Sequence, residues 1–231
     1  MLQGRNEAES RHWFDAVKHY PFEGWAFAGA HKDHFSLIVR RLLDMRNEGL
    51  LQRCDWLHVL GVSTLAIGCL LTAVQRAVRE FVNPRFQISF DSAGPFRNAG
   101  SKSITVGQTL DEFGWSLQHH PISKFGAADN DRYLSDVLDE RLATMEDSRP
   151  RRRQLAQSFL VDKLKLGDLR GEDGDVSSDG YWLLMHHNIE ATINAHREAH
   201  DRMFDDDPLT YDPVIIPPSL KTIEAMIRMA F

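Results

Sequence analysis

The chain has 231 residues, of which 42% are hydrophobic, and its formal net charge is -6. This length is enough for one large domain, or for one domain with an appendage. The acidic balance excludes a global basic field, so any contact with nucleic acid must be local. Two cysteines exclude a disulfide framework and a four-cysteine zinc set, and they fit a reducing cytoplasm. We expect neither a membrane-spanning helix nor a signal peptide, because no long apolar stretch is present.

Residues 1–100 alternate between short apolar runs and segments whose apolar residues recur at helical spacing. The runs predict strands and the spaced segments predict helices, with Gly49 ending the second helix. This alternation is typical of parallel strands joined by right-handed crossovers, and four strands with three helices make half of an eight-stranded α/β barrel. The predicted strands are the end of a strand at 1–3 and those at 25–30, 56–62 and 86–90; the predicted helices cover 13–20, 35–43 and 66–81.

Residues 101–180 break this alternation with scattered glycines and a basic run. The middle of this segment, 133–166, is predicted to be helical, and a longer helix is expected at 181–204. The expected organisation is a half-barrel over 1–106, a mostly helical insertion over 107–180, and C-terminal helices over 181–231 that close the barrel.

Asp91 directly follows the predicted strand at 86–90 and opens a loop that contains Gly94 and Pro95. A carboxylate at the carboxyl end of a strand, followed by a loop, is typical of the catalytic edge of an α/β barrel. An aspartate that only caps a turn gives the same pattern, and this alternative stays open. Asp91 is therefore a candidate catalytic residue.

Five short motifs occur in one order along the chain: Gln3-Gly4, Phe22-Glu23-Gly24-Trp25-Ala26-Phe27-Ala28-Gly29, His58-Val59-Leu60-Gly61-Val62-Ser63, Phe90-Asp91 with Pro95-Phe96-Arg97, and His187-Asn188. In this order and spacing they resemble the C-terminal half of the guanine transglycosylase family. That family comprises the tRNA-guanine transglycosylases and their DNA-modifying relatives in phages and bacteria. The resemblance covers residues 2–100 and 181–204 and is closest to the DNA-modifying relatives.

The resemblance implies the C-terminal half of a TIM-type (β/α)8 barrel that exchanges guanine for a 7-deazaguanine such as preQ0, most simply in DNA. Asp91 would be the nucleophile, which forms a covalent glycosyl-enzyme and retains configuration. The implied base-binding residues are Gln3, Ala28, Gly29, Ala30 and Leu60. A surface glutamine, strand-end packing and a core leucine are the simpler interpretations of these residues.

Basic residues downstream of Asp91 are candidates for contact with the nucleic-acid backbone, although a short run of charge is usually a solvated face. These candidates are Arg97, Arg149, Arg151, Arg152 and Arg153.

The chain also departs from the family pattern. The Cys-x-Cys-x-x-Cys cluster of the family's zinc site has no counterpart, so we expect no metal and no cofactor, and His187 lacks the partners that tetrahedral zinc needs. Ala28-Gly29 stands where the family has Gly-Gly. The two aspartates on the family's first four strands also have no counterpart, so an N-terminal half-barrel subunit or a homo-oligomer is expected as partner, beside nucleic acid and the incoming base.

Several alternatives stay open. The chain could be a tRNA-guanine transglycosylase of the queuosine or archaeosine type. It could also be a non-catalytic accessory subunit, or a truncated fragment, of the same fold. The expected compartment is the cytoplasm of a bacterium or of a phage-infected host.

Overall fold

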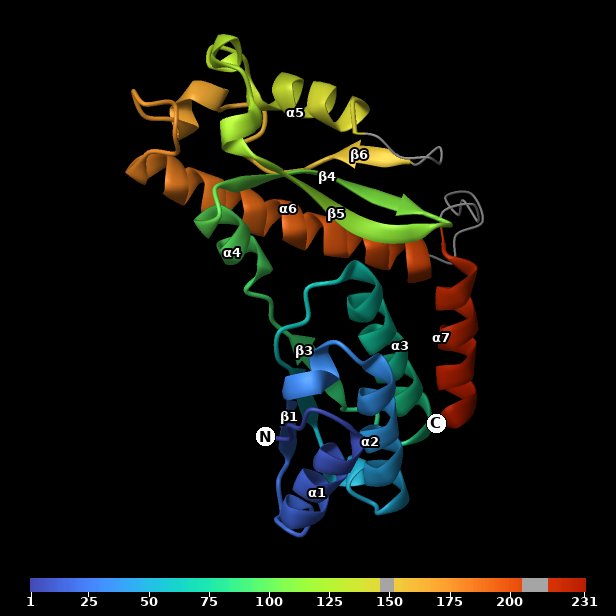
Figure 1. The fold of residues 1–231 in the computed structure, drawn as a ribbon. Helices are drawn as coiled ribbons and strands as arrows, with labels where there is room; N and C mark the ends of the chain where they lie inside the picture. Colours follow the sequence, from blue (N-terminus) through green and yellow to red (C-terminus); the bar gives the residue numbers. More distant parts are fainter. Residues whose placement is uncertain (146–151, 205–215) are drawn as a thin grey trace. The chain divides into compact units, whose positions relative to one another are not determined.

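The computed structural model describes residues 1–145, 152–204 and 216–231. The chain is a mixed α/β protein that divides into two compact units, each with one small sheet (Figure 1). Unit 1 comprises Met1–Ser92 and Pro218–Phe231, and unit 2 comprises Ala93–Pro217. No helix in the described part of the chain is both long and apolar enough to cross a membrane.

The sheet of unit 1 has three parallel strands in the order β1-β2-β3, namely β1 (Gly24–Phe27), β2 (Trp56–Val59) and β3 (Gln87–Phe90). Leu2 adds a parallel bridge to Phe27, so the spatial order follows the chain order. The three predicted strands and the predicted strand end at 1–3 are thus confirmed. The strands themselves are shorter than predicted.

Three helices connect these strands: α1 (Glu7–Val17), α2 (Phe35–Asn47) and α3 (Leu65–Phe81). The side chain of Asn6 caps α1 by accepting a hydrogen bond from the Glu9 amide at 3.0 Å. Gly49, with φ of +73°, follows α2 as predicted, in a conformation that glycine adopts without strain. A further helix, α7 (Pro218–Ala230), packs on α3.

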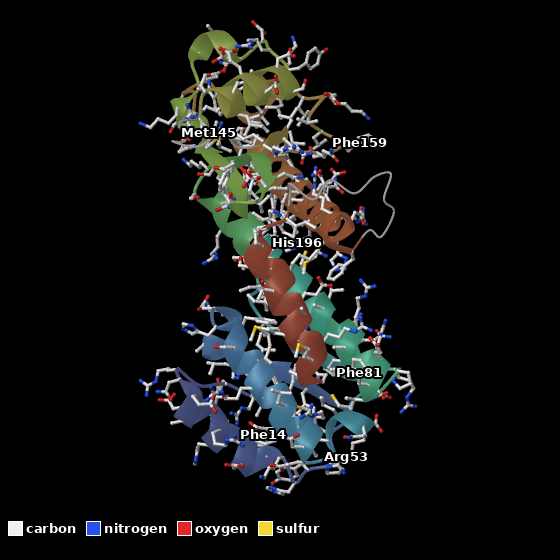
Figure 2. The ribbon with its side chains drawn as sticks, turned by 90° about the vertical axis from the view of Figure 1, so that its right-hand side faces the viewer. Phe14, Arg53, Phe81, Met145, Phe159 and His196 are labelled. Carbon is white, nitrogen blue, oxygen red and sulfur yellow. The ribbon has the colours of Figure 1, made fainter. Side chains whose placement is uncertain are left out.

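One face of this sheet is buried and the other is open. On the buried face, Trp25 and Phe27 of β1 lie beside Leu57 and Val59 of β2, respectively. Phe14 of α1, labelled in Figure 2, lies 6.3 Å from Trp25 between ring centroids and is fully buried. On the opposite face Trp56 is 49% exposed.

An ion-pair network joins α1 to α2 beneath the sheet. Arg41 is fully buried and pairs with Glu7 of α1 and, at 3.1 Å, with Asp44 of its own helix. Asp44 also pairs with Arg11 at 2.8 Å. The guanidinium of Arg41 additionally lies over the ring of Phe14, 5.6 Å from its centroid.

Arg41→Met should destabilise unit 1 by about 2–4 kcal/mol, because it leaves Glu7 and Asp44 short of their buried cation. Urea unfolding followed by tryptophan fluorescence measures the change. The neighbouring Arg40 is 62% exposed, and at 3.9 Å its ion pair with Glu7 is long and weak. Arg40→Met is therefore the matched control, and it should lower the free energy of unfolding by less than about 0.5 kcal/mol. If the two variants lower the free energy of unfolding equally, the ion-pair network around Arg41 does not stabilise unit 1 as expected.

Unit 2 contains an antiparallel sheet in the order β5-β4-β6. The strands are β4 (Ser103–Asp111), β5 (Gly114–Pro121) and β6 (Arg153–Leu155); the helices are α4 (Gly94–Gly100), α5 (Leu134–Ala143) and α6 (Ser178–Phe204). Helices α5 and α6 both pack against β4, whose residues are buried almost throughout. The Asp111 carboxylate closes the β4–β5 hairpin by accepting hydrogen bonds from the amides of Phe113 and Gly114.

The prediction of a mostly helical segment over 107–180 was wrong, because its first part is a β-hairpin. The helix predicted over 133–166 is only the ten-residue α5. The boundary between units lies at Ser92 rather than at 106. The helix predicted at 181–204 is confirmed as α6, which belongs to unit 2, whereas α7 belongs to unit 1.

Partly buried histidines make the stability of unit 2 depend on pH. Burial, helped by the charge of His200, lowers the pKa of His196 to about 4, and His196 is labelled on α6 in Figure 2. Burial also lowers the pKa of His119. As the pH falls below about 6.5, these histidines take up protons more readily in the unfolded state than in the folded state. Acidification therefore favours unfolding.

The free energy of unfolding should accordingly fall between pH 7 and pH 5, with about 1–2 kcal/mol of the fall due to His196. In His196→Gln the fall in the free energy of unfolding between pH 7 and pH 5 should be smaller by about 1–2 kcal/mol. This comparison does not depend on how stable the variant is at pH 7. Urea titrations of both proteins at the two pH values measure it. An unchanged difference would contradict the role of His196.

Candidate functional site at the strand ends

The carboxyl ends of the strands in unit 1 form one edge of its sheet. Because all the strands run in the same direction, the residues that follow them lie side by side in chain order. These residues are Gln3 and Gly4, then Ala28, Gly29 and Ala30, then Leu60 and Gly61, and finally Asp91. The predicted nucleophile and the predicted base-binding residues therefore share this edge.

Backbone hydrogen bonds tie the first two strand ends together. The Ala28 amide donates to the Leu2 carbonyl at 2.8 Å, and the Ala30 amide donates to the Gly4 carbonyl at 2.9 Å. Gly29 between them has φ of +65°, and a Cβ there would lie 2.8 Å from the Gly4 carbonyl oxygen. Only glycine fits this close approach, which holds Gln3 next to Gly29 at the surface.

His31 is a buried residue of this edge that sequence reasoning missed. Its Nδ1 lies 2.7 Å from the Ala28 carbonyl oxygen, and its Nε2 lies 3.0 Å from Ser10 Oγ. Burial lowers the pKa of His31, so the ring is neutral: Nδ1–H donates to Ala28 and Nε2 accepts from the Ser10 hydroxyl. The ring thus fixes the Ala28 carbonyl from beneath the site. A lone histidine two residues after a glycine gives no sequence signal for this role.

Asp91 presents an exposed carboxylate at the end of β3. Its Oδ1 accepts a hydrogen bond of 2.6 Å from the Gly61 amide at the end of β2. Its Oδ2 lies 3.7 Å from His58 Nε2, and His58 Nδ1 lies 2.9 Å from Ser89 Oγ. With 60% of the side chain exposed, the carboxylate is oriented by one oxygen while the other stays accessible from solvent. The bond to Gly61 caps the turn after β2, and the exposed second oxygen is compatible with a nucleophile or an anionic binding group.

Leu60 occupies the position between the Gly29 loop and Asp91. Its amide donates to the Phe27 carbonyl at 2.9 Å, which continues the β1–β2 pairing beyond the strands, and its side chain is half-buried. Gly61, with φ of +79°, turns the chain so that its own amide reaches Asp91. The turn after β2 therefore serves both the sheet and the carboxylate.

The predicted backbone-contact arginines do not join this edge within unit 1. Arg97 is an exposed residue of α4 in unit 2. Arg152 and Arg153 also belong to unit 2, where Arg153 begins β6 and pairs with Thr109 of β4. Arg149 and Arg151 lie outside the described residues. Contact of these arginines with nucleic acid stays a prediction.

The His187-Asn188 pair attaches α6 to β4. His187 Nε2 lies 2.8 Å from the Thr105 carbonyl oxygen, and its Nδ1 lies 2.7 Å from Ser158 Oγ. Asn188 accepts from the Thr105 amide at 2.7 Å and donates to the Ser103 carbonyl at 2.9 Å. Both ring nitrogens of His187 are thus engaged, and burial lowers its pKa, which keeps the ring neutral. These contacts give the motif a structural role.

Metal-ligating side chains are not grouped in the described part of the chain: no three of its His, Cys, Asp and Glu residues lie close enough to hold an ion. Cys54 and Cys69 are both buried. Burial raises the pKa of Cys54 to about 11 and that of Cys69 to about 12, so both are protonated thiols at neutral pH.

Comparison with known proteins does not assign the chain to a family. No protein-family model matches the chain, and no curated protein matches it.

His31→Phe should destabilise unit 1 by about 1–3 kcal/mol, because it leaves the Ala28 carbonyl and the Ser10 hydroxyl buried without partners. Adding Ser10→Ala should recover part of the loss, since it removes one of the two orphaned groups. Thermal unfolding of the single and double variants measures both effects. The hypothesis fails if His31→Phe is as stable as the unmodified protein.

Proposed function

We propose that this chain supplies the nucleophile and part of the base pocket of a nucleic-acid guanine transglycosylase. The observation that carries the proposal is the shared edge described above. Asp91 and the five candidate base-binding residues lie at neighbouring strand ends of one parallel sheet. This arrangement supports the resemblance in the short motifs, in which the same residues have these roles.

In the proposed reaction Asp91 attacks C1′ of a target nucleoside and displaces guanine, which leaves with its bonding electron pair. The product is an ester between the carboxylate and the sugar. The partner's general acid/base protonates the departing guanine and takes the N9 proton of the incoming 7-deazaguanine. This base attacks C1′ from the side opposite the ester and releases the carboxylate, so configuration is retained. The Gly61 amide holds Asp91 Oδ1, and the second oxygen beside His58 is accessible for attack.

The hydrogen bonds of the Gly29 loop indicate which of its residues could contact the base. The amides of Ala28 and Ala30 are used by Leu2 and Gly4, and the Ala28 carbonyl is used by His31. Gly29 is exposed and has no side chain, so it is the best placed of the three residues to present backbone to a purine edge. Exposed Gln3 next to it offers both a donor and an acceptor.

The strand order of unit 1 supports the proposal of a barrel half. Strands of a (β/α)8 barrel follow chain order around the sheet, whereas a doubly wound sheet reverses direction at a switch point. Here the order runs from Leu2 through β1 and β2 to β3 without reversal. The face that carries exposed Trp56 would then line the barrel interior. We propose that a half-barrel from a partner covers it and supplies the general acid and the base-reading aspartate.

DNA is the proposed substrate. The chain lacks the cysteine cluster of the zinc site, and in this respect it is more similar to the DNA-modifying relatives than to the tRNA enzymes. Reaching C1′ of a paired guanine requires the base to be flipped or the duplex to be opened, at a cost of a few kcal/mol. A tRNA guanine in a loop is already unstacked and is the alternative substrate.

Asp91→Asn should abolish a covalent protein–DNA adduct, because the amide keeps the shape of the carboxylate and loses its nucleophilic charge. The tagged chain, with the proteins that co-purify with it, is incubated with guanine-containing DNA and resolved on denaturing gels. Asp55, a half-exposed residue that precedes β2 at the opposite end of the sheet, provides the control Asp55→Asn, which should keep the adduct.

An adduct that persists in Asp91→Asn would reject Asp91 as nucleophile. If the unmodified protein with its co-purified partners gives neither adduct nor base exchange, the accessory-subunit alternative is favoured. Radiolabelled 7-deazaguanine offered with duplex DNA and with bulk tRNA separately identifies the substrate. Label that enters tRNA alone would reject DNA and keep the transglycosylase.

A further inference from the structure

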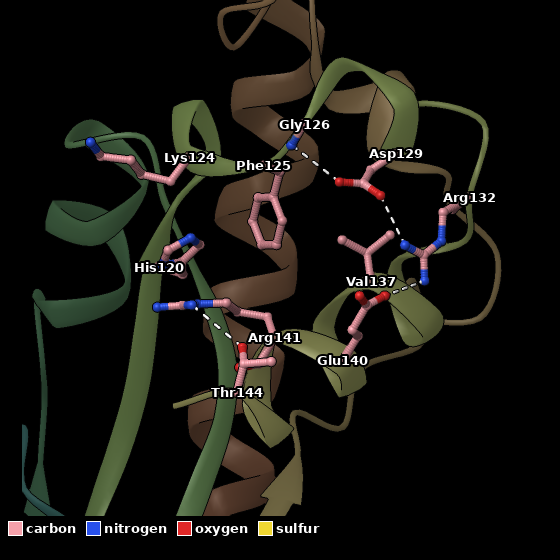
Figure 3. A pocket seen from close by; sticks show the side chains of 10 residues that line it. All are labelled: His120, Lys124, Phe125, Gly126, Asp129, Arg132, Val137, Glu140, Arg141 and Thr144. Atoms are coloured by element: carbon pink, nitrogen blue, oxygen red, sulfur yellow. Dashed lines mark hydrogen bonds and ion pairs between the residues drawn. The ribbon is translucent and has the colours of Figure 1, made fainter. Parts of the chain in front are cut away.

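Unit 2 contains a hollow of about 160 Å³ between the end of β5, the turn that follows it and α5 (Figure 3). Its acidic side chains are confined to one side. There Arg132 bridges Asp129 and Glu140, with N···O distances of 2.8 Å to each carboxylate. Asp129 also accepts a hydrogen bond from the Gly126 amide at 3.1 Å. Both carboxylates are therefore paired with the same cation, Arg132.

The other side of the hollow carries three basic residues: His120 from β5, Lys124 from the following turn, and Arg141 from α5 (Figure 3). The charges of Arg141 and Lys124 both act on His120, because they add to burial in lowering the pKa of its ring. The hollow therefore has a neutral His120 ring on this side, with the positive charges of Arg141 on α5 and of Lys124 at its rim.

Arg141 is the residue with unused hydrogen-bonding capacity. Its Nε is buried without a hydrogen-bond partner among the groups that the structure describes. Its Nη1 makes only a long contact of 3.5 Å with the Thr144 hydroxyl one turn along the chain. A buried guanidinium nitrogen without an acceptor is unfavourable unless a ligand supplies one.

The size of the hollow limits what can bind there. Pockets for whole small molecules usually measure about 300–1,000 Å³. This hollow has room for one tetrahedral oxyanion, with no enclosed space for a base and a sugar as well. A planar guanidinium matches the oxygens of a phosphate.

We propose that this hollow binds one backbone phosphate of a nucleic-acid strand, with Arg141 as the principal donor, Thr144 beside it and Lys124 at the rim. Only the phosphate would enter the hollow. The sugar and base would stay outside it as part of the strand, whereas in a free nucleotide they would have no contacts in the hollow. The choice of nucleic acid as the source of the phosphate rests on the proposed function, whereas the anion site rests on the local geometry alone.

Fluorescence anisotropy with a labelled single-stranded oligonucleotide, over a range of NaCl concentrations, tests the proposal on the full chain. Arg141→Gln should weaken binding about three- to tenfold and reduce the slope of log affinity against log salt by about one. Lys124→Gln should act in the same direction, and because Lys124 is exposed this variant does not threaten folding. Arg197→Gln, which removes the same charge from an exposed site on α6, is the matched control.

Equal binding by the Arg141, Lys124 and Arg197 variants would overturn the proposal. Inorganic phosphate provides a second arm: if it binds at Arg141 as tightly as the oligonucleotide does, a free anion is the ligand and the nucleic-acid assignment is overturned. Oligonucleotide binding that depends on Arg141, in a protein that shows no base exchange, would reject the proposed function and leave the phosphate site standing.

Discussion

The parallel pairing that runs from Leu2 through β1 and β2 to β3 is the constraint on which the candidate site depends. It brings strand ends that are far apart in the sequence onto one edge. Burial of alternate residues on one face fixes this register, since a slip by one residue would turn Trp25 and Leu57 away from the helices. The glycine at position 29 then lets the first two strand ends approach closely.

Much of unit 1 could be predicted from the sequence because its signals are local. Apolar runs of β-forming residues gave the strands, apolar residues at helical spacing gave the helices, and chain order gave the shared edge. The contacts that refine the site could not be predicted in this way. The bond from His31 to Ala28 and the approach of Gly29 to Gly4 depend on the positions of separate elements. Neither leaves a pattern in the neighbouring residues.

Unit 2 was predicted less well, and β4 shows why. Its pairing with β5 shifts between Thr105 and Gly107, so Val106 forms a bulge. Val106 belongs to the same apolar core cluster as Leu142, and a Cβ on Gly107 would also point at Leu142. The bulge shifts the alternation of residues between the two faces by one position, which disturbs the pattern that identifies a strand. By contrast, α6 could be predicted because its 27 residues keep one helical pattern throughout.

Unit 1 is discontinuous in the chain, since all of unit 2 is inserted between Ser92 and Pro218. Leu220 and Ile227 of α7 are buried, and Arg228 of the same helix pairs with Glu80 of α3 at 2.7 Å. During synthesis, the ribosome must therefore complete unit 2 before the helix that covers α3 emerges. Until then the nascent unit 1 exposes part of the apolar surface of α3, which makes this the stage at which a chaperone would have most to bind.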